Sequence, residues 1–360
     1  MKILCLCPIG IGNYLLAWPA FRFLRDTLPE AKLHLLALRH AILDFAQYDP
    51  VWDGIHSIDP TRDTGLGKKS RIIAELSGEH FDVSLCFFPA NNWQSNLLPF
   101  LCGIRKRYAF RYALKQGASL SFLNSRFLPV DSGLHDVDQN LRLAAAFSGK
   151  PLPKPPPTFP QLFGEEDWIA ALRLLESMGG PDRCIGIHPG SSGEHGMGAK
   201  RWDPMRFGEL GLRICNALGA KALILGSREE DPLKRITASI MKEPHRIVEP
   251  CSLRLTAALI RRCSLFLCND SGLMHVAACM GIPTVALFGP TDDKRNGPVG
   301  SGNLVIRREM AGFPVWTAEN VGVRAVRGDI DPSASLRALS VDEAWERVEP
   351  WLEQLILKEL

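Results

Sequence analysis

Short apolar runs alternate with stretches of helical periodicity along the first part of the chain. Residues 3–7 form an apolar run, a glycine turn follows at residues 10–13, and apolar side chains then recur at helical spacing over residues 15–24. Further apolar runs cover residues 32–38 and 81–87. An order of strand, turn, helix and strand predicts a parallel sheet that is covered by helices.

The second part of the chain repeats this order. We predict strands over residues 184–188, 221–225, 264–268 and 284–288, and helices over residues 202–218, 232–241, 253–262 and 273–280. The last twenty residues predict one long helix that begins with the capping box Ser340 to Glu343.

A proline-rich segment separates the two parts. Residues 150–160 hold six prolines in eleven positions, and proline lacks the backbone N–H that a helix or a central strand uses, so this segment predicts a linker. We expect an N-terminal domain over residues 1–155, a C-terminal domain over residues 156–340 and a terminal helix over residues 341–360. Two open α/β domains of this kind face each other across a cleft, with ligands at the carboxyl ends of their strands.

Composition narrows the class of protein. The 360 residues are 46% hydrophobic and 22% charged, which supports two packed cores and excludes disorder as the main state. A net charge of +3 argues against a dedicated nucleic-acid binder, and no apolar run reaches the ~18 residues of a spanning helix. Ten scattered cysteines without a Cys-x-x-Cys pair are typical of a reducing cytosol.

The turn after the predicted strand at residues 264–268 carries the densest candidate chemistry. It contains Asp270, Ser271 and Gly272, and His275 follows one helical turn later on the same face as Ser271. A capped helix start leaves free N–H groups for an anion, and a glycine lets a phosphate approach the backbone. The alternative is that Asp270 only caps the helix and His275 is a core histidine. The combination favours a ligand-binding role.

A second candidate loop follows the predicted strand at residues 184–188. Ser191 and Ser192 supply hydroxyl donors, and Lys200 supplies positive charge ahead of the next helix. These groups fit a diphosphate, although the spacing is not that of a P-loop. Turns at residues 226–230 and 289–293 end neighbouring strands. Glu229 and Glu230 either bind sugar or ribose hydroxyls or are ordinary acids of a first helical turn.

The N-terminal part offers weaker signals. Gly12 and Asn13 end the first strand, but the third glycine of a dinucleotide fingerprint is missing. Residues 83–130 hold basic residues and no acid, which indicates either a wall for an anionic second substrate or a solvated loop plus helix; the basic residues are Arg105, Lys106, Arg107, Arg111, Lys115 and Arg126. Two Asp-x-Asp sequences, at residues 136–138 and 329–331, follow no clear central strand and are discounted as metal sites.

Several of these segments together resemble one family. Residues 269–278 and 281–291 are very similar to the signature of the heptosyltransferase-like glycosyltransferases of family 9, and the loops at residues 12–20 and 188–202 also match in family order. The resemblance runs from Lys2 to Pro298, and the segment at residues 299–340 is not placed by it.

The resemblance implies the GT-B fold and an inverting transfer of a heptose from ADP-heptose to an acceptor of the lipopolysaccharide core. It implies no cofactor and no metal, a cytoplasmic location with peripheral contact at the inner membrane, and an anionic glycan or glycolipid acceptor. The donor would contact Ser191, Ser192, Lys200, Glu229, Glu230, Asp270, Ser271, Gly272 and His275. The acceptor would contact Gly12, Asn13, Arg105, Arg107, Arg111, Lys115, His135 and Asp136, and the catalytic set would be Asn13, Lys200 and His275.

Asn13 departs from the family pattern, which has an aspartate as general base at this position. A neutral carboxamide cannot accept the proton of an acceptor hydroxyl. Three explanations follow: another base such as His135, Asp136 or His275, an acceptor that is already ionised, or a chain that binds its donor with little or no turnover. The alternatives to a transferase are therefore a non-catalytic sugar-nucleotide binder and a nucleotide-sugar epimerase of GT-B-like fold.

Overall fold

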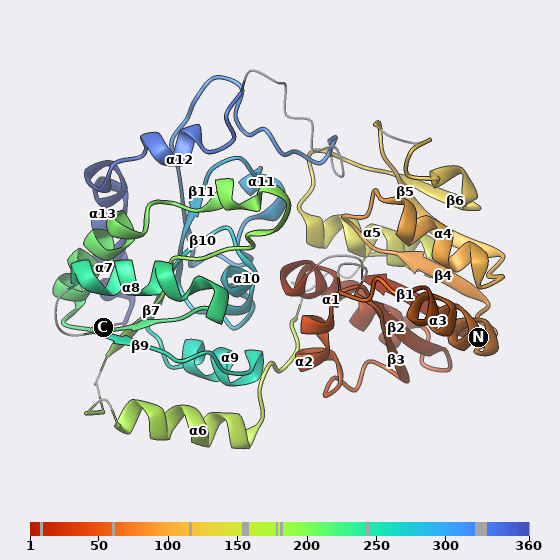
Figure 1. Cartoon of the computed structure of the whole chain (residues 1–360), viewed down its shortest axis with the longest axis horizontal. Helices are drawn as coiled ribbons and strands as arrows, with labels where there is room; N and C mark the ends of the chain where they lie inside the picture. The colour runs from red at the N-terminus through yellow and green to blue at the C-terminus, as the bar shows by residue number, and fades with distance from the viewer. Residues whose placement is uncertain are drawn as a thin grey trace. The chain divides into compact units, whose positions relative to one another are not determined.

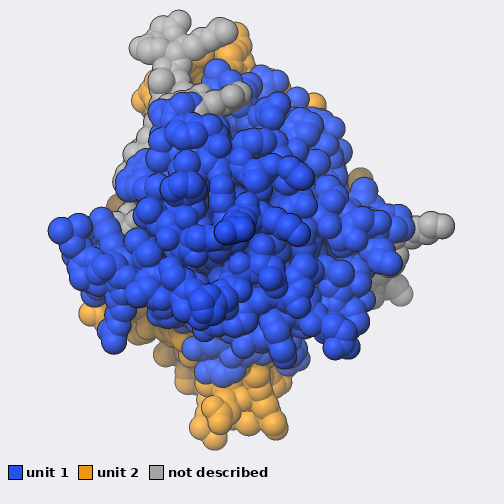
Figure 2. Space-filling view, turned by 90° about the vertical axis from the view of Figure 1, so that its right-hand side faces the viewer, with its two compact units in different colours: residues 1–161, 316–325 blue, residues 162–315, 326–360 orange. Residues whose placement is uncertain are grey.

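The apolar runs of the sequence form two six-stranded parallel sheets in the computed structural model of the chain. The structure describes residues 1–7, 10–59, 62–114, 117–152, 158–177, 179–180, 183–241, 245–320 and 330–359. Contacts divide the chain into unit 1, residues 1–161 and 316–325, and unit 2, residues 162–315 and 326–360 (Figure 2). The division thus lies six residues beyond the expected boundary at residue 155, and a later segment returns to unit 1.

Unit 1 is a sheet with the strand order β3-β2-β1-β4-β5-β6 and helices on both faces (Figure 1). Its elements are β1 (Lys2–Cys7), α1 (Ile11–Thr27), β2 (Lys32–Ala37), η1 (His40–Ile42), α2 (Leu43–Ala46), β3 (Gly54–Ser57), α3 (Leu66–Gly78), β4 (Val83–Cys86), α4 (Trp93–Leu101), β5 (Lys106–Arg111), η2 (Ser121–Leu123), β6 (Arg126–Pro129) and α5 (Asp136–Ser148). Helices α1 and α5 pack against each other. Leu4, Leu36 and Leu76 belong to the core beneath α3.

Unit 2 repeats the plan with the strand order β12-β11-β10-β7-β8-β9. Its elements are α6 (Glu165–Glu176), β7 (Cys184–His188), η3 (Glu194–Lys200), α7 (Pro204–Leu218), β8 (Lys221–Ile224), η4 (Arg228–Glu230), α8 (Asp231–Met241), β9 (His245–Ile247), α9 (Leu253–Arg261), β10 (Leu265–Asn269), α10 (Gly272–Cys279), β11 (Thr284–Phe288), α11 (Asp293–Asn296), β12 (Leu304–Arg307), α12 (Ala334–Ala338) and α13 (Val341–Glu359).

The C-terminal helix α13 is part of unit 2. It packs against α7 (Figure 1), and its Ala344, Val348 and Leu352 are buried in the same core as residues of α7. The capping box expected at its start is present, because the Ser340 N–H donates to Glu343 Oε2 at 2.8 Å and the Glu343 N–H donates to Ser340 Oγ at 3.2 Å. No helix among the described residues is long and apolar enough to span a bilayer.

The structure corrects one expectation and places one segment that the sequence left open. The sequence predicts residues 106–111 as part of a basic wall or of a solvated loop plus helix, but they form strand β5, which lies between β4 and the edge strand β6 of the unit 1 sheet. The segment after residue 298, which the family resemblance leaves unplaced, supplies the edge strand β12 of unit 2. None of the ten cysteines takes part in a disulfide bond among the described residues.

Candidate functional site

The candidate site of unit 2 lies where the order of its strands reverses. From β7 the chain proceeds to β8 and β9 on one side, and it then crosses over to β10 and β11 on the other. Loops that follow the two central strands of such a sheet diverge and leave a crevice at the carboxyl ends. The loops after β7 and β10 are the two that carry the densest sequence motifs, at residues 189–192 and 270–275.

Asn269, the last residue of β10, links these two loops. Its side chain is fully buried, its Oδ1 accepts from the Trp202 N–H at 3.0 Å, and its Nδ2 donates to the carbonyls of Pro189 at 2.9 Å and Gly190 at 3.3 Å. A carboxamide donates and accepts at once, whereas a carboxylate only accepts. Sequence reasoning assigned no role to Asn269; its place inside the strongest motif was the available signal.

Asp270 and Lys200 form an ion pair in which the carboxylate is buried and the lysine side chain is half-buried. Lys200 Nζ lies 2.8 Å from Asp270 Oδ2, and Asn296 Nδ2 donates to Asp270 Oδ1 at 3.2 Å. Burial alone would raise the pKa of the Asp270 carboxyl, but the Lys200 charge and hydrogen bonds from Lys200 and Thr291 lower that pKa below its ordinary value. The interpretation of Asp270 as a helix cap is therefore wrong: the cap is Ser271, whose Oγ accepts from the Met274 N–H at 3.4 Å.

A chain of polar contacts runs from Ser271 through His188, to which the sequence assigned no role, to Glu230 in η4, the short helix after β8. His188 Nε2 lies 3.3 Å from Glu230 Oε2, and His188 Nδ1 lies 3.1 Å from Ser271 Oγ. An ionised carboxylate only accepts, so Nε2 carries the proton and, in the neutral ring, Nδ1 accepts the Ser271 hydroxyl proton. In this arrangement Ser271 has already used its one O–H donor.

Glu230 ends this chain, and Glu229 does not belong to it. The Glu230 side chain is buried and caps Ser227, whose N–H donates to Oε2 at 2.8 Å, while Glu229 is exposed. Burial raises the pKa of Glu230, but the hydrogen bonds from His188 and Ser227 outweigh that effect and lower it to about 2. Gly190 makes this packing possible, because a Cβ there would lie 2.0 Å from Glu230 Oε1.

The Ser191 hydroxyl is the group in this loop that lacks a partner. It is buried, and among the described residues its Oγ has no hydrogen-bond partner. Arg201 holds the adjacent backbone by donating from Nε to the Ser191 carbonyl at 3.1 Å. Ser192 is exposed. A buried hydroxyl usually finds a partner, so Ser191 is placed to donate to a ligand.

The remaining residues of the unit 2 prediction lie on α10 and in the loop after β11. Gly272 begins α10, and His275 is buried one turn later, where its charge would stabilise the Asp270 carboxylate. Arg307, which the sequence did not single out, fixes the loop after β11 by donating to the Gly289 carbonyl at 2.6 Å and to Asp293 Oδ1 at 2.9 Å.

Unit 1 has the same reversal of strand order, between β1 and β4. Gly12 and Asn13 lie in the first turn of α1 at this point, Gly12 buried and Asn13 half-buried. The loop after β4 is held by Asn140, whose Oδ1 accepts from the Phe88 N–H at 2.7 Å and whose Nδ2 donates to the Phe88 carbonyl at 3.3 Å. His135 caps α5 by accepting from the Val137 N–H at 3.3 Å.

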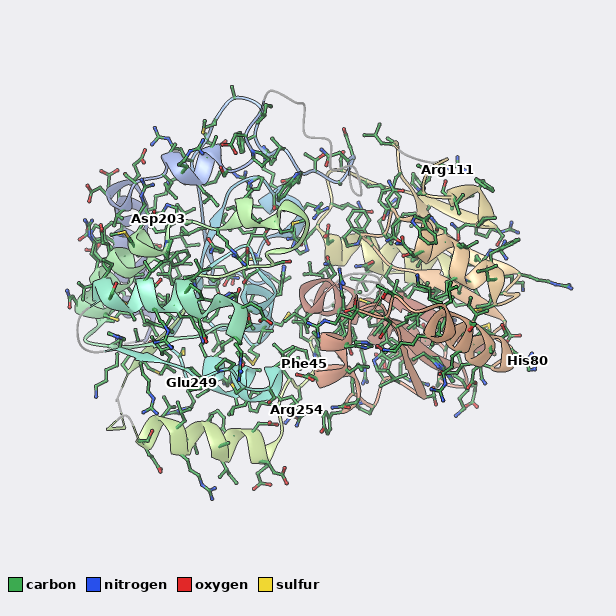
Figure 3. All side chains as sticks on the ribbon, in the orientation of Figure 1. Phe45, His80, Arg111, Asp203, Glu249 and Arg254 are labelled. Carbon is green, nitrogen blue, oxygen red and sulfur yellow. The ribbon has the colours of Figure 1, made fainter. Side chains whose placement is uncertain are left out.

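Among the described residues, the basic side chains predicted for the acceptor are spread along strand β5 from one end to the other. Arg105 precedes the amino end of β5, whereas Arg111, which is labelled in Figure 3, ends that strand. The Arg111 guanidinium carbon lies 4.9 Å from the centre of the Phe127 ring. Arg107 is committed to its own segment, since its Nε donates to the Leu123 carbonyl at 2.7 Å. Asp136 is fully buried at the start of α5. Lys115 lies outside the described residues.

Comparisons with known proteins bear on both units. The model of glycosyltransferase family 9 (heptosyltransferase) matches residues 70–314. The chain is 27% identical over 317 residues to lipopolysaccharide heptosyltransferase 2 of Salmonella typhimurium, which covers 85% of this chain and 88% of that protein. A similar protein of Escherichia coli is 26% identical over the same length.

Two solved structures are similar over nearly the full length. The ADP-heptose lps heptosyltransferase II of E. coli superposes with a TM-score of 0.73 at 20% identity and covers all of both chains. A family 9 glycosyl transferase of Veillonella parvula superposes with a TM-score of 0.78 at 19% identity, over 98% of this chain and 97% of that one. The GT-B fold class expected from the sequence is confirmed.

Proposed function

Because the chain belongs to glycosyltransferase family 9, we propose that it transfers a heptose from ADP-heptose to an acceptor of the lipopolysaccharide core, with inversion at the anomeric carbon. The relatives at 27% and 26% identity carry the name lipopolysaccharide heptosyltransferase 2, and a heptosyltransferase at 15% identity has been solved with ADP. The resemblance found in the sequence and the enzyme class it implies, a glycosyltransferase, agree with this match.

We place the donor at the strand reversal of unit 2. The observation that supports this assignment is the buried Ser191 hydroxyl, which has no hydrogen-bond partner among the described residues. Asn269 links the loop of Ser191 to the end of β10. The Lys200–Asp270 ion pair lies at that same end of β10. Ser191 donates to a phosphate oxygen, and Lys200, oriented by Asp270, takes up negative charge on the leaving diphosphate. The α10 N-terminus adds backbone dipoles of the same sign.

In this proposal an acceptor oxygen attacks the anomeric carbon while the bond from that carbon to the diphosphate breaks, ADP departs and the proton of the acceptor hydroxyl passes to solvent water. The acceptor is an anionic glycolipid that contacts Asn13 in unit 1. Asn13 orients the acceptor but takes no proton, because a carboxamide has no basic lone pair near neutral pH. Removal of the proton from the acceptor is therefore a slow step in the proposed enzyme. Its proposed location is the cytoplasm, in peripheral contact with the inner membrane where the acceptor resides.

Calorimetric titration with ADP, UDP, GDP and dTDP tests the donor assignment. We expect selective ADP binding that weakens by about 10- to 100-fold in His275→Ala, the range of a lost charged hydrogen bond. His245→Ala, which removes a histidine from β9, is the matched control and keeps the affinity. A preference for another nucleotide would overturn the donor, and equal affinity in the two variants would overturn the site. Transfer of heptose from ADP-heptose to a heptosylated core acceptor tests the reaction itself.

A further inference from the structure

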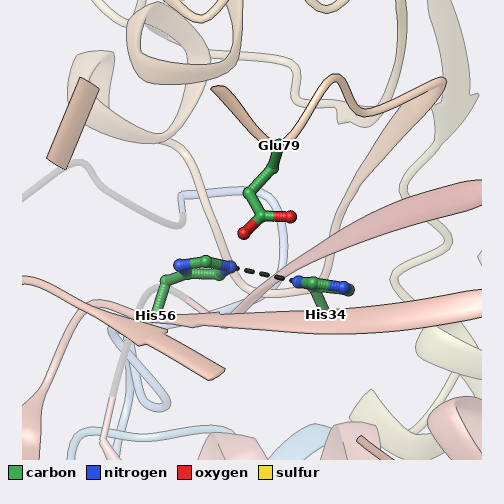
Figure 4. A group of neighbouring side chains, drawn as sticks. All are labelled: His34, His56 and Glu79. Atoms are coloured by element: carbon green, nitrogen blue, oxygen red, sulfur yellow. Dashed lines mark hydrogen bonds between the residues drawn. The ribbon is translucent and has the colours of Figure 1, made fainter. Parts of the chain in front are cut away.

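Two histidines of unit 1 face each other on neighbouring strands. His34 lies on β2 and His56 on β3, and the register pairs His34 with Gly54 and Leu36 with His56, so both imidazoles extend from the same face of the sheet. Their rings stack at 5.4 Å with 14° between the planes, and both side chains are buried. His34 Nδ1 lies 3.1 Å from His56 Nε2 (Figure 4).

Glu79, directly after α3, completes the group. Its carboxylate points toward the gap between the two ring nitrogens (Figure 4), and one ligand atom from each of the three residues lies within 4.8 Å of the others. Two ligands of one tetrahedral zinc ion, each at ~2.05 Å, stand about 3.3 Å apart. The separation of the two ring nitrogens matches that value closely.

A hydrogen bond to Glu75 orients His56 as a metal ligand. Its Nδ1 lies 2.5 Å from Glu75 Oε1. Because a carboxylate only accepts, Nδ1 holds the proton, and the neutral ring then directs the lone pair of Nε2 toward His34. Metal-bound histidines characteristically donate their second N–H to a carboxylate in this way.

The backbone makes room for the other ring. A Cβ at Gly54 would lie 2.4 Å from His34 Nδ1, so only glycine allows the imidazole to lie across β3. Phe81 meets both rings edge-on, at 5.1 Å for His34 and 6.0 Å for His56, and closes one side against water. Lys2 Nζ contacts Glu79 Oε2 at 2.6 Å, and a carboxylate has a second oxygen to offer.

We propose that His34, His56 and Glu79 bind one Zn²⁺ ion, with Glu75 as a positioning residue, and that this ion ties the edge strand β3 to β2 and to the end of α3. Two imidazoles and one carboxylate suit zinc, whereas calcium and magnesium favour oxygen ligands alone. The proposal replaces the sequence-based expectation of no metal for this chain. None of its residues belongs to the site proposed for the donor, so it stands or falls separately from the proposed function.

The test uses full-length protein without a histidine tag, treated with a chelator and dialysed against Zn²⁺. We expect one equivalent of zinc by elemental analysis, a rise in melting temperature that the chelator reverses, and tetrahedral d–d absorption when Co²⁺ is used. His56→Gln should lose the bound equivalent, and Glu75→Ala should weaken zinc binding by about 10- to 100-fold. The control His245→Gln, in unit 2, should keep the full equivalent.

Retention of one equivalent by His56→Gln, or no zinc on the untreated and the reloaded wild-type protein, would overturn the proposal. Because a buried substitution can impair folding, Glu79→Gln at the half-buried end of α3 provides a second variant. It should keep the wild-type circular dichroism and ADP affinity while losing the zinc-dependent rise in melting temperature. An unchanged rise in that variant would equally count against the site.

Discussion

The two strand reversals have the same topology but different chemistry. In unit 2 the loops after β7 and β10 are joined by the Asn269 carboxamide and also by ionised side chains, since Lys200 pairs with Asp270 and Glu230 contacts His188. In unit 1 the loop after β4 is held by a neutral carboxamide, because Asn140 binds the backbone of Phe88, and another carboxamide, Asn13, lies in the first turn of α1. The same scaffold therefore carries two ionised contacts at the strand reversal of unit 2, whereas the contact that holds the loop after β4 in unit 1 is uncharged.

This difference indicates which unit is prepared for an anion. A buried charge is stable only when it is paired with an opposite charge. In unit 2 a phosphate can compete with the Asp270 carboxylate for the Lys200 ammonium group. Carboxamide links hold loops without any long-range field. We infer that unit 2 contributes electrostatic stabilisation of a leaving diphosphate, while unit 1 contributes shape and orientation for the acceptor.

Removal of Lys200 should have the largest effect. Lys200→Ala leaves the Asp270 carboxylate buried at 3% exposure without its cation, which we expect to cost about 3 kcal/mol of unfolding free energy and to abolish ADP binding. Urea unfolding and calorimetry measure the two quantities. The double variant Lys200→Ala/Asp270→Asn should regain stability but not binding. A loss no greater than that of the exposed Lys294→Ala would show that the pair is not buried in solution.

Glu230→Gln tests the charge on the other side of the crevice. A pKa lowered from 4.5 to about 2 corresponds to roughly 3 kcal/mol of stability. Since the folded pKa lies below the unfolded one, this stability is complete above about pH 4.5 and is lost as the pH falls toward 2.

The expected result is a constant stability difference between wild type and Glu230→Gln from pH 7 to 5, which shrinks at lower pH in urea titrations. Glu229→Gln, at the exposed neighbour, should stay within ~0.5 kcal/mol of wild type at every pH. A difference that grows on acidification would reverse the sign of our assignment.

The features that the sequence predicted are those that depend on residues close together in the chain, and the features that it missed depend on residues far apart in the chain. Strands such as β7 and β11 were predicted correctly, because central parallel strands are continuous apolar runs. The strand β5 was missed, since its basic residues at both ends concealed it. Local patterns identified the loops around Asp270 and Ser191.

The contacts between side chains of different loops could not be predicted from the sequence. Lys200 meets Asp270 seventy positions later, and nothing in either loop specifies that contact. The choice between Glu229 and Glu230 depends on the phase of one short helical turn, which adjacent identical residues cannot reveal. The cluster of His34, His56 and Glu79 was invisible for the same reason, because its members come from two strands and the end of a helix.

The substitution Asn13→Asp would place an ionised side chain at the strand reversal of unit 1, as unit 2 already has at its own. A carboxylate in the first turn of α1 is stabilised by the helix dipole and can accept the acceptor proton. We expect transfer to rise on the order of 10²-fold, the lower end of general-base contributions. Initial rates with ADP-heptose and a core acceptor measure it, and Asn13→Ala should show no gain. Equal rates for Asp and Asn at this position would mean that proton removal is not limiting.

Asn140→Ala should damage unit 1 while leaving the donor site intact. It removes the acceptor of the buried Phe88 N–H, which we expect to cost about 2 kcal/mol of unfolding free energy. ADP affinity should not change, because the link lies wholly within unit 1. Asn92→Ala, which removes only the N-cap of α4, should cost about 1 kcal/mol. A loss of ADP affinity in Asn140→Ala would contradict the separation of the two chemistries.

The smallest effect, from Ser191→Ala, separates binding from stability within unit 2 itself. Its buried hydroxyl has no partner among the described residues, so its removal should leave the unfolding free energy within ~0.5 kcal/mol of wild type. The same hydroxyl donates to the diphosphate in our proposal, so ADP affinity should fall by about 1 kcal/mol, or roughly fivefold. Ser192→Ala, at the exposed neighbour, should change neither quantity. A destabilised Ser191→Ala with unchanged affinity would mean that the hydroxyl serves the fold, and the donor would then have to be held by the Lys200–Asp270 pair and the α10 N-terminus alone.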